Sequence, residues 1–363
     1  MEKKSRVQYY DIIRVLAIGL VILGHCLGKW MLWDQPMDKT RTVIHVIYCF
    51  CPMCIGIFFM ISGALLLKDK KNQSVRFVFT KRVPRVLVPA LFWSVIYLIF
   101  YSAERFTQPI SGTFIKRVFI PNAVNTVKNS LNTPWSSHLW FVYAMLAFYI
   151  LLPILCTIIQ NATKKQLEYI LAVWFVAGCI VPLIGDFFPS IAMPNRGNIN
   201  ILSGYAGIFI LGYYLDTYVK KISLPVCAGL FAAVMVFTVV FATKYINSGR
   251  GFPPVHHYYS PTVLAASGCV VLAVKELNTR KPLSEKTYSV ITKLSAATFG
   301  TYFCHELVRI LLQNRLISMG LSPYAVIAIN FTATLIISFA AAYIALKIPY
   351  INYLFCGVKI IKK

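Results

Sequence analysis

The chain has 363 residues, 58% of them hydrophobic, and a formal net charge of +24. This composition excludes an ordinary soluble domain. In a soluble protein this charge would suggest nucleic-acid binding, but the basic residues lie mostly in alternate short loops between apolar runs. We therefore expect no nucleic-acid partner, and we attribute the charge to membrane orientation and to contact with anionic phosphate.

Apolar runs of membrane-spanning length recur from end to end of the chain. We predict an all-α, polytopic bundle of about ten transmembrane helices that forms one domain over 1–363, with no appended soluble domain. The first run lacks a small-residue cleavage site and is interpreted as a retained span, not a signal peptide. The predicted spans are 11–31, 43–67, 84–103, 138–160, 166–185, 200–217, 224–243, 261–276, 296–317 and 323–347.

The basic residues predict an orientation for these spans. Twenty-three of the 36 lie in one alternating set of segments, and the positive-inside rule places that set, with both termini, in the cytoplasm. An even number of spans agrees with this placement. We expect a multi-pass protein of the cell (cytoplasmic) membrane, in contact with membrane lipids. The basic set comprises the N-terminus, the loops at 68–85, 164–165, 220–221 and 275–293, and the tail from Lys347.

Three predicted external loops are long, at 104–137, 186–199 and 244–260. Long loops in a compact protein are usually functional or disordered. Tyr258 and Tyr259 in the third loop either stack on a sugar or belong to the interfacial aromatic belt, and the belt is the commoner use of such residues.

The first span carries three groups that a bilayer should reject: Asp11, Arg14 and His25. Asp11 and Arg14 are one turn apart and can form a pair at a helix end. Eleven positions separate Arg14 from His25, which is three turns plus roughly 20°, so the two share one helix face about 16 Å apart. Because ionisable groups inside a membrane usually face a bundle interior or a cavity, this face predicts a functional site.

The second span holds two short motifs. Ser62 and Gly63 are small residues that allow helices to approach closely, and they also leave room for a ligand chain. Cys51 and Cys54 have the spacing of a redox motif, but without a thioredoxin-like context we interpret them as packing residues.

A basic cluster, Lys81, Arg82 and Arg85, precedes the third span, and Pro84 suits a helix start. Arginine at a helix N-terminus favours phosphate binding. Basic residues just inside a membrane are also expected from topology alone, so both interpretations stay open.

Polar residues also mark the fourth and ninth spans. His138 and Trp140 open the fourth span, where a tryptophan is usually an interfacial anchor. His305 and Glu306 lie inside the ninth span with Arg309 one turn later, and Glu306 and Arg309 can pair at i and i+3. His305 is a second intramembrane titratable group without that simple explanation.

Taken in order, these residues resemble the integral-membrane acyltransferase-3 family, whose members O-acylate cell-surface glycans. The resemblance covers essentially the whole chain and is of the polysaccharide or enterobacterial-common-antigen O-acetyltransferase type. Arg14-x10-His25 is its most diagnostic part. The other matching parts are Asp11-x2-Arg14, Ser62-Gly63, Arg82-x2-Arg85, Leu139-Trp140-Phe141 with Tyr149 and Pro153, and Gly300-x-Tyr302-x2-His305.

The resemblance implies an enzyme that takes an acyl group, usually acetyl from cytoplasmic acetyl-CoA, and passes it to a hydroxyl of a glycan or lipid-linked saccharide at the outer face. No metal is expected. Some relatives carry an additional extracellular domain that this chain lacks. Transfer would then finish within the membrane domain or need a separate extracytoplasmic partner protein.

Roles follow from the resemblance and from the chemistry of the side chains. A neutral imidazole is a suitable base for a hydroxyl, and cations or hydrogen-bond donors stabilise the oxyanion. His25 is expected to be the general base or the acyl-carrying nucleophile, and His305 to orient it or relay protons. Arg14, oriented by Asp11, is expected to contact CoA or to stabilise charge. The CoA phosphates are assigned to Lys81, Arg82 and Arg85, and the substrate to Ser62, His138, Trp140, Tyr302 and Glu306.

Two other function classes are compatible with this pattern. A transporter or flippase for a lipid-linked or anionic solute would also use intramembrane charges, but the chain shows no internal repeat or paired broken helices. A sensor or scaffold would leave the Arg14–His25 face without a role. A relative of the same fold that acylates an amine or a small molecule is a further alternative.

Overall fold

The computed structural model describes residues 7–33, 35–104, 136–187 and 196–358, with the backbone alone at 102–104 and 196–203. The described residues form helices and no strand, which confirms the predicted all-α fold. The helices are α1 (Gln8–Gly28), α2 (Lys39–Tyr48), α3 (Met53–Leu66), η1 (Lys70–Gln73), α4 (Val75–Phe77), η2 (Val78–Arg82), α5 (Val83–Glu104), η4 (Ser137–Leu139), α8 (Trp140–Asn161), α9 (Lys164–Phe175), η5 (Val176–Ile180), α10 (Val181–Phe187), α11 (Arg196–Tyr218), α12 (Leu224–Asn247), η7 (Pro254–His256), α13 (Pro261–Arg280), α14 (Glu285–Ser318), α15 (Pro323–Lys347) and α16 (Ile351–Cys356).

Within the described residues, eight helical segments are long and apolar enough to cross a membrane. The remaining two predicted spans, 200–217 and 296–317, coincide with α11 and α14. α14 carries His305, Glu306 and Arg309 in its middle, and these residues make it less apolar than the other long helices. The eight segments are Gln8–Gly28, Lys39–Leu66, Val75–Tyr101, Ser137–Asn161, Lys164–Phe187, Leu224–Asn247, Pro254–Arg280 and Pro323–Lys347.

Two predicted spans differ in outline from the helices observed. The span predicted at 43–67 is two helices, α2 and α3, because Pro52 cannot donate a backbone hydrogen bond and the chain turns between Tyr48 and Met53. The span predicted at 296–317 begins earlier, at Glu285, where the Ser284 side chain caps α14 by accepting from the Thr287 N–H.

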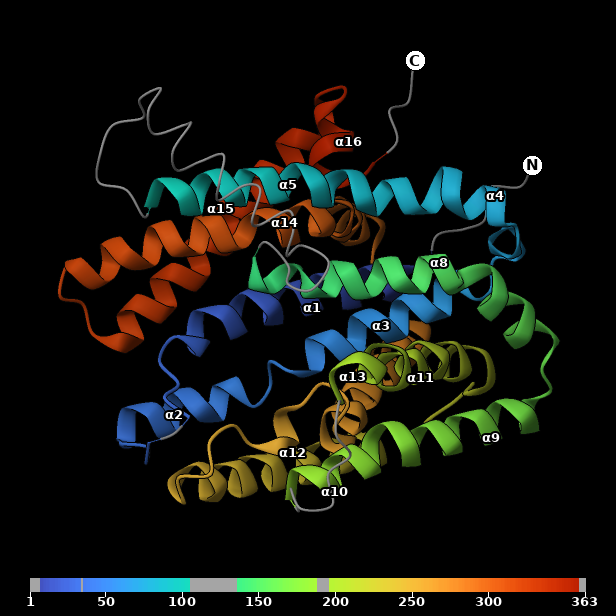
Figure 1. Ribbon diagram of the computed structural model, residues 1–363, viewed down its shortest axis with the longest axis horizontal. Coiled ribbons are helices and arrows are strands. Elements are labelled where there is room, and N and C mark those ends of the chain that lie inside the picture. Colours follow the sequence, from blue (N-terminus) through green and yellow to red (C-terminus); the bar gives the residue numbers. More distant parts are fainter. Residues whose placement is uncertain (1–6, 34, 105–135, 188–195, 359–363) are drawn as a thin grey trace.

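The long helices lie side by side in one bundle (Figure 1). α1 is central, since it packs against α3 on one side and α14 on the other. α5, α15 and α16 lie to one side of α1 in the view, and α9, α10 and α12 lie to the other. The face of α1 that carries Arg14 and His25 is thus inside the bundle.

The distribution of polar and apolar residues is that of a membrane protein. Ile336 and Ile344 on α15 are exposed, whereas Asn330, Thr334 and Ser338 on the same helix are buried. α12 likewise exposes large apolar side chains. Polar groups inside and apolar groups outside indicate a lipid environment around the bundle.

Glycines let α3 and α11 pack at backbone distance. A Cβ atom on Gly63 would lie 1.7 Å from the carbonyl oxygen of Phe209, and one on Gly212 would lie 2.0 Å from that of Met60. The close approach predicted at Ser62-Gly63 is confirmed, and the partner helix is α11.

Several of the predicted cytoplasmic segments meet at one end of the bundle. The Asp216 carboxylate, near the end of α11, accepts hydrogen bonds from the hydroxyls of Tyr9 and Tyr10 at the start of α1. It also pairs with Lys68, which follows α3, and with Lys275 in the last part of α13. The N-terminal end of α1, the segment after α3 and the end of α11 therefore lie together with Lys275 at one end of the bundle.

Candidate active site

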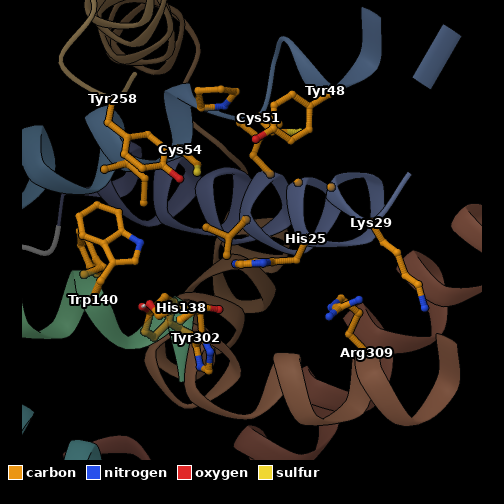
Figure 2. Close-up of a pocket in the computed structure, with 18 residues that line it drawn as sticks. His25, Lys29, Tyr48, Cys51, Cys54, His138, Trp140, Tyr258, Tyr302 and Arg309 are labelled. Carbon is orange, nitrogen blue, oxygen red and sulfur yellow. Dashed lines mark hydrogen bonds between the residues drawn. The ribbon is translucent and has the colours of Figure 1, made fainter. Parts of the chain in front are cut away.

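Two of the cavities between the described residues are lined by predicted site residues. The first, the histidine cavity, has a volume of about 520 Å³ and is lined by His25, His138, Trp140, Tyr258 and Arg309 among others (Figure 2). The second, the arginine cavity, has a volume of about 300 Å³ and is lined by Arg14, Ser62, Arg85, Tyr149 and Ser295 among others. The first volume lies within the range of ordinary small-molecule sites, and the second lies at the lower end of that range.

Phe141 and Tyr302 line both cavities, so their side chains form the wall between them. The Tyr302 hydroxyl donates a hydrogen bond to the carbonyl oxygen of His138 and fixes this wall to the start of α8. A group that passes from one cavity to the other has to cross at these two rings.

α1 contributes to both cavities, as its periodicity predicts. Arg14 lines the arginine cavity and His25 lines the histidine cavity. Asp11 holds this helix against α14, because its buried carboxylate accepts from Ser295 Oγ at 2.6 Å and from the Tyr288 hydroxyl at 3.1 Å. Arg14 Nη1 lies 3.5 Å from the same carboxylate. Asp11 therefore orients Arg14 and fixes the register of α1 on α14.

Three histidines from three different elements converge at the histidine cavity. The ring centroids of His25 and His305 are 5.3 Å apart, as are those of His138 and His305, and His25 and His138 are 6.3 Å apart. Figure 2 shows His25 in the middle of the cavity, with His138 and Tyr302 on one side and Arg309 on the other. Imidazoles at this spacing can accept and pass on protons.

Hydrogen bonds to Nδ1 orient two of these rings. His305 Nδ1 donates to the Tyr302 carbonyl oxygen at 2.5 Å, which leaves Nε2 as the proton-accepting nitrogen of a neutral ring. His138 Nδ1 lies 2.9 Å from Ser136 Oγ. Both Nε2 atoms are buried and have no hydrogen-bond partner among the described residues.

Glu306 links His25 to Arg309. The Glu306 carboxylate accepts from Arg309 Nε at 2.8 Å and from Nη2 at 2.7 Å, so the predicted pair is confirmed and is bidentate. His25 Nδ1 lies 3.8 Å from the same carboxylate, too far for a hydrogen bond but close enough for electrostatic attraction. A positive charge that develops on His25 would be stabilised by Glu306.

Glu306, His25 and His305 also offer ligand atoms within 4.8 Å of one another, the spacing of a cation site. Arg309 already supplies a positive charge to the Glu306 carboxylate through two hydrogen bonds. The arrangement therefore fits a Glu306–Arg309 ion pair beside His25, in which Arg309 balances the carboxylate charge without a metal.

The predicted phosphate-binding cluster divides in the structure. Arg85 lines the arginine cavity. Arg82 instead pairs with Asp69 at 2.8 Å and donates from Nε to Asn72 Oδ1 at 2.9 Å, which ties η2 to η1. Lys81 is exposed and is not among the residues that line the arginine cavity. Of Arg82 and Arg85, it is therefore Arg85 that lines the arginine cavity, where it joins Arg14.

The remaining predicted substrate residues fall on both sides of the wall. Ser62 lines the arginine cavity, and Trp140 lines the histidine cavity. Tyr258 stacks on Trp140 with ring centroids 5.2 Å apart and planes 14° apart. The loop at 244–260 therefore reaches the histidine cavity through Tyr258. Residues 105–135 of the loop at 104–137 and residues 188–195 of the loop at 186–199 lie outside the described residues.

Sequence reasoning gave an incomplete picture of three residues. It placed His138 at the outer interface as a substrate residue, and the structure brings His138 into the histidine cluster. It named Tyr149 without giving it a role and did not name Ser295, and both line the arginine cavity. The spacing of Ser295 and Tyr302, seven positions apart on α14, is the signal that could have placed both on one helix face. Cys51 and Cys54 are free, buried thiols that line the histidine cavity.

Comparison with known proteins gives one match. The family model described as "Acyltransferase domain", of the acyltransferase-3 type, matches residues 7–346. Searches of curated proteins and of solved structures found no match.

Proposed function

Because this chain belongs to the acyltransferase-3 family of membrane proteins, we propose that it moves an acyl group from a donor in the arginine cavity to an acceptor hydroxyl in the histidine cavity. The donor is acetyl-CoA from the cytoplasm, and the acceptor is a cell-surface or lipid-linked glycan. The observation that carries the proposal is the pair of cavities with different linings that meet at Phe141 and Tyr302.

The arginine cavity suits the thioester end of CoA. Its wall combines the guanidinium groups of Arg14 and Arg85 with apolar side chains such as Phe58, Met145 and Phe299. Guanidinium groups bind phosphate, and an apolar slot accepts a narrow pantetheine arm while it excludes water. The acyl carbon would then lie against the wall formed by Phe141 and Tyr302.

The histidine cavity suits the acceptor. His25 accepts the proton of the hydroxyl as its oxygen forms an ester bond with the acyl carbon, and the carbon–sulfur bond breaks. The CoA thiolate leaves and takes up a proton, and the proton on His25 leaves through His305 or His138 to solvent. Glu306 stabilises the imidazolium, and Arg309 supplies positive charge in the same cavity. Trp140 and Tyr258 offer aromatic faces for a sugar ring.

The test uses the full chain in nanodiscs with acetyl-CoA labelled in the acetyl group. Wild type is expected to release CoA and to pass the label to a glycan acceptor, and His25→Ala is expected to do neither. His257→Gln, a histidine that lines neither cavity, is the matched control and should behave as wild type. Label retained on wild-type protein but not on His25→Ala would identify His25 as the acyl carrier instead of the base.

One result would contradict the proposal. If wild type binds an anionic solute, moves it across a membrane and leaves acetyl-CoA intact in the presence of glycan acceptors, the protein is a transporter. Equal turnover by wild type and His25→Ala would remove His25 from the mechanism.

A further inference from the structure

A second cluster of chemically active side chains lies away from the two cavities. His45 on α2, Cys49 just after α2, and His256 at the end of η7 meet with their side-chain ligand atoms together. All three residues are buried, with relative exposures of 0%, 4% and 1%. The acyl-transfer proposal gives them no role. From this geometry we propose that the three side chains bind a zinc ion that joins the loop at 244–260 to α2.

The distances match the edges of a coordination tetrahedron. With Zn–N near 2.0–2.1 Å and Zn–S near 2.3 Å, tetrahedral geometry requires N···N of about 3.3 Å and N···S of about 3.6 Å. His45 Nε2 and His256 Nε2 are 3.2 Å apart, and Cys49 Sγ lies 3.6 Å and 4.0 Å from them. One ion can therefore reach all three atoms with shifts of a few tenths of an ångström.

The donor set is one that zinc prefers. Two imidazole nitrogens and one thiolate form a borderline-soft set, and a water molecule can complete the tetrahedron. On binding, Cys49 releases its thiol proton to solvent, and both rings bind as neutral imidazoles. A metal-free histidine pair with the thiol hydrogen-bonded beside it is the plainest alternative, and the metal content of the purified protein separates the two.

The surroundings also fit a metal site. Thr243 Oγ1 on α12 lies 3.4 Å from His45 Nδ1, and a hydroxyl that accepts from Nδ1 leaves Nε2 to face the ion. Trp33, Tyr48 and Phe252 pack around the His256 ring, with centroids 5.7–6.0 Å away. A dry aromatic shell of this kind limits exchange of a bound ion.

The position of the cluster connects it to the histidine cavity. Tyr48 is on α2 and lines that cavity. Tyr258 follows His256 by two positions and stacks on Trp140 in the cavity wall. α2 lies beside one end of α12 (Figure 1). An ion held by His45, Cys49 and His256 would therefore fix the side of the histidine cavity that Tyr48 and Tyr258 form, where the proposed acceptor binds.

The experiment measures metal in the full-length protein, purified in detergent through a tag that contains no histidine. Zinc supplied during expression is expected at about one equivalent per chain in wild type and well below that in Cys49→Ser and His256→Gln. The matched controls are Cys156→Ser, another buried free thiol, and His257→Gln, the neighbouring histidine, and both should keep the zinc.

A second measurement does not depend on the folding of any variant. Chelator-treated wild type titrated with Co²⁺ should gain a thiolate-to-cobalt charge-transfer band, which zinc then abolishes.

A third measurement concerns the side chain that orients His45. Thr243→Val should bind zinc roughly 10-fold or more weakly than wild type, because it removes that side chain's hydroxyl.

Wild type with substoichiometric zinc and no cobalt–thiolate band would overturn the proposal. Equal zinc in wild type and in Cys49→Ser would overturn it as well, since the metal would then lie elsewhere, and copper in place of zinc would refute the assignment to zinc. None of these readouts requires acyl transfer, so the zinc site and the acyltransferase proposal can fail independently.

Discussion

The arginine cavity and the histidine cavity share two wall residues and differ in almost every other respect. The first offers fixed positive charge in an apolar slot, and the second offers imidazoles that can gain and lose protons beside aromatic rings. α1 supplies the key side chain to each, Arg14 to one and His25 to the other. The contrast teaches that one membrane helix can supply side chains of different chemistry to two cavities at two depths, and the proposed function assigns donor binding to one cavity and proton transfer to the other.

The largest effect should come from the histidine cavity. His25→Ala should lower the rate of acyl transfer by about 10²–10⁴-fold, the usual contribution of a general base, and should leave acetyl-CoA affinity near the wild-type value. Turnover of labelled acetyl-CoA and equilibrium binding of acetyl-CoA, measured on the same preparation, separate the two properties. An equal loss of acetyl-CoA affinity would mean that donor binding and proton transfer are not divided between the two cavities.

The arginine cavity is tested by two neighbouring arginines. Arg85→Ala should weaken acetyl-CoA binding about 10-fold or more, because a charge-assisted contact is lost. Arg82→Ala should change affinity little and should lower thermal stability, since Arg82 holds Asp69 and Asn72. The sequence alone predicts equal roles for the two, and an equal loss of affinity would restore that interpretation.

The wall between the cavities is tested at Tyr302. Tyr302→Ala should join the two cavities and admit water to the thioester, so that acetyl-CoA hydrolysis without an acceptor rises roughly tenfold. Tyr302→Phe keeps the ring and should keep hydrolysis low. If hydrolysis by the alanine variant stays at the wild-type level while the protein remains monodisperse, the ring is not the barrier.

The smallest expected effect comes from Gly357, which lines the arginine cavity at φ 64°. A Cβ atom there would lie 2.0 Å from the Arg85 carbonyl oxygen, so Gly357→Ala should displace Arg85 and weaken acetyl-CoA binding a few-fold. Gly249→Ala is the matched control, because Gly249 also has a positive φ, 71°, but has no atom within 4 Å of the added carbon. Equal affinities in the two variants would show that the contact with Arg85 is irrelevant.

Local patterns predicted the fold well. Every predicted span falls on one or more helical segments, because apolar runs of bilayer length are a strong local signal. The break at Pro52 and the early start of α14 were missed. The break at Pro52 depends on neighbouring helices that tolerate an interrupted span, and these are not visible in a local pattern. The first part of α14 is polar, so a search for apolar runs does not detect where the helix begins.

The candidate site was predictable only in part. Helical periodicity placed Arg14 and His25 on one inward face, and the i, i+3 spacing predicted the pair Glu306–Arg309. The meeting of His25, His138 and His305 depends on how three distant segments pack, so no local pattern reports it. The diversion of Arg82 to Asp69 depends on the fold of a loop. The cluster that we propose to bind zinc joins His45 and Cys49 to His256, a residue more than 200 positions away.

The central claim is that the donor lies in the arginine cavity and that its acyl group reaches His25 across the wall. Electron cryomicroscopy of the full chain in nanodiscs, with a CoA thioether that cannot transfer its acyl group, tests this most directly. The CoA phosphates are expected beside Arg85, and the acyl end is expected against Phe141 and Tyr302. Density for CoA at the opening of the histidine cavity, beside Lys29 and Tyr48, would contradict it.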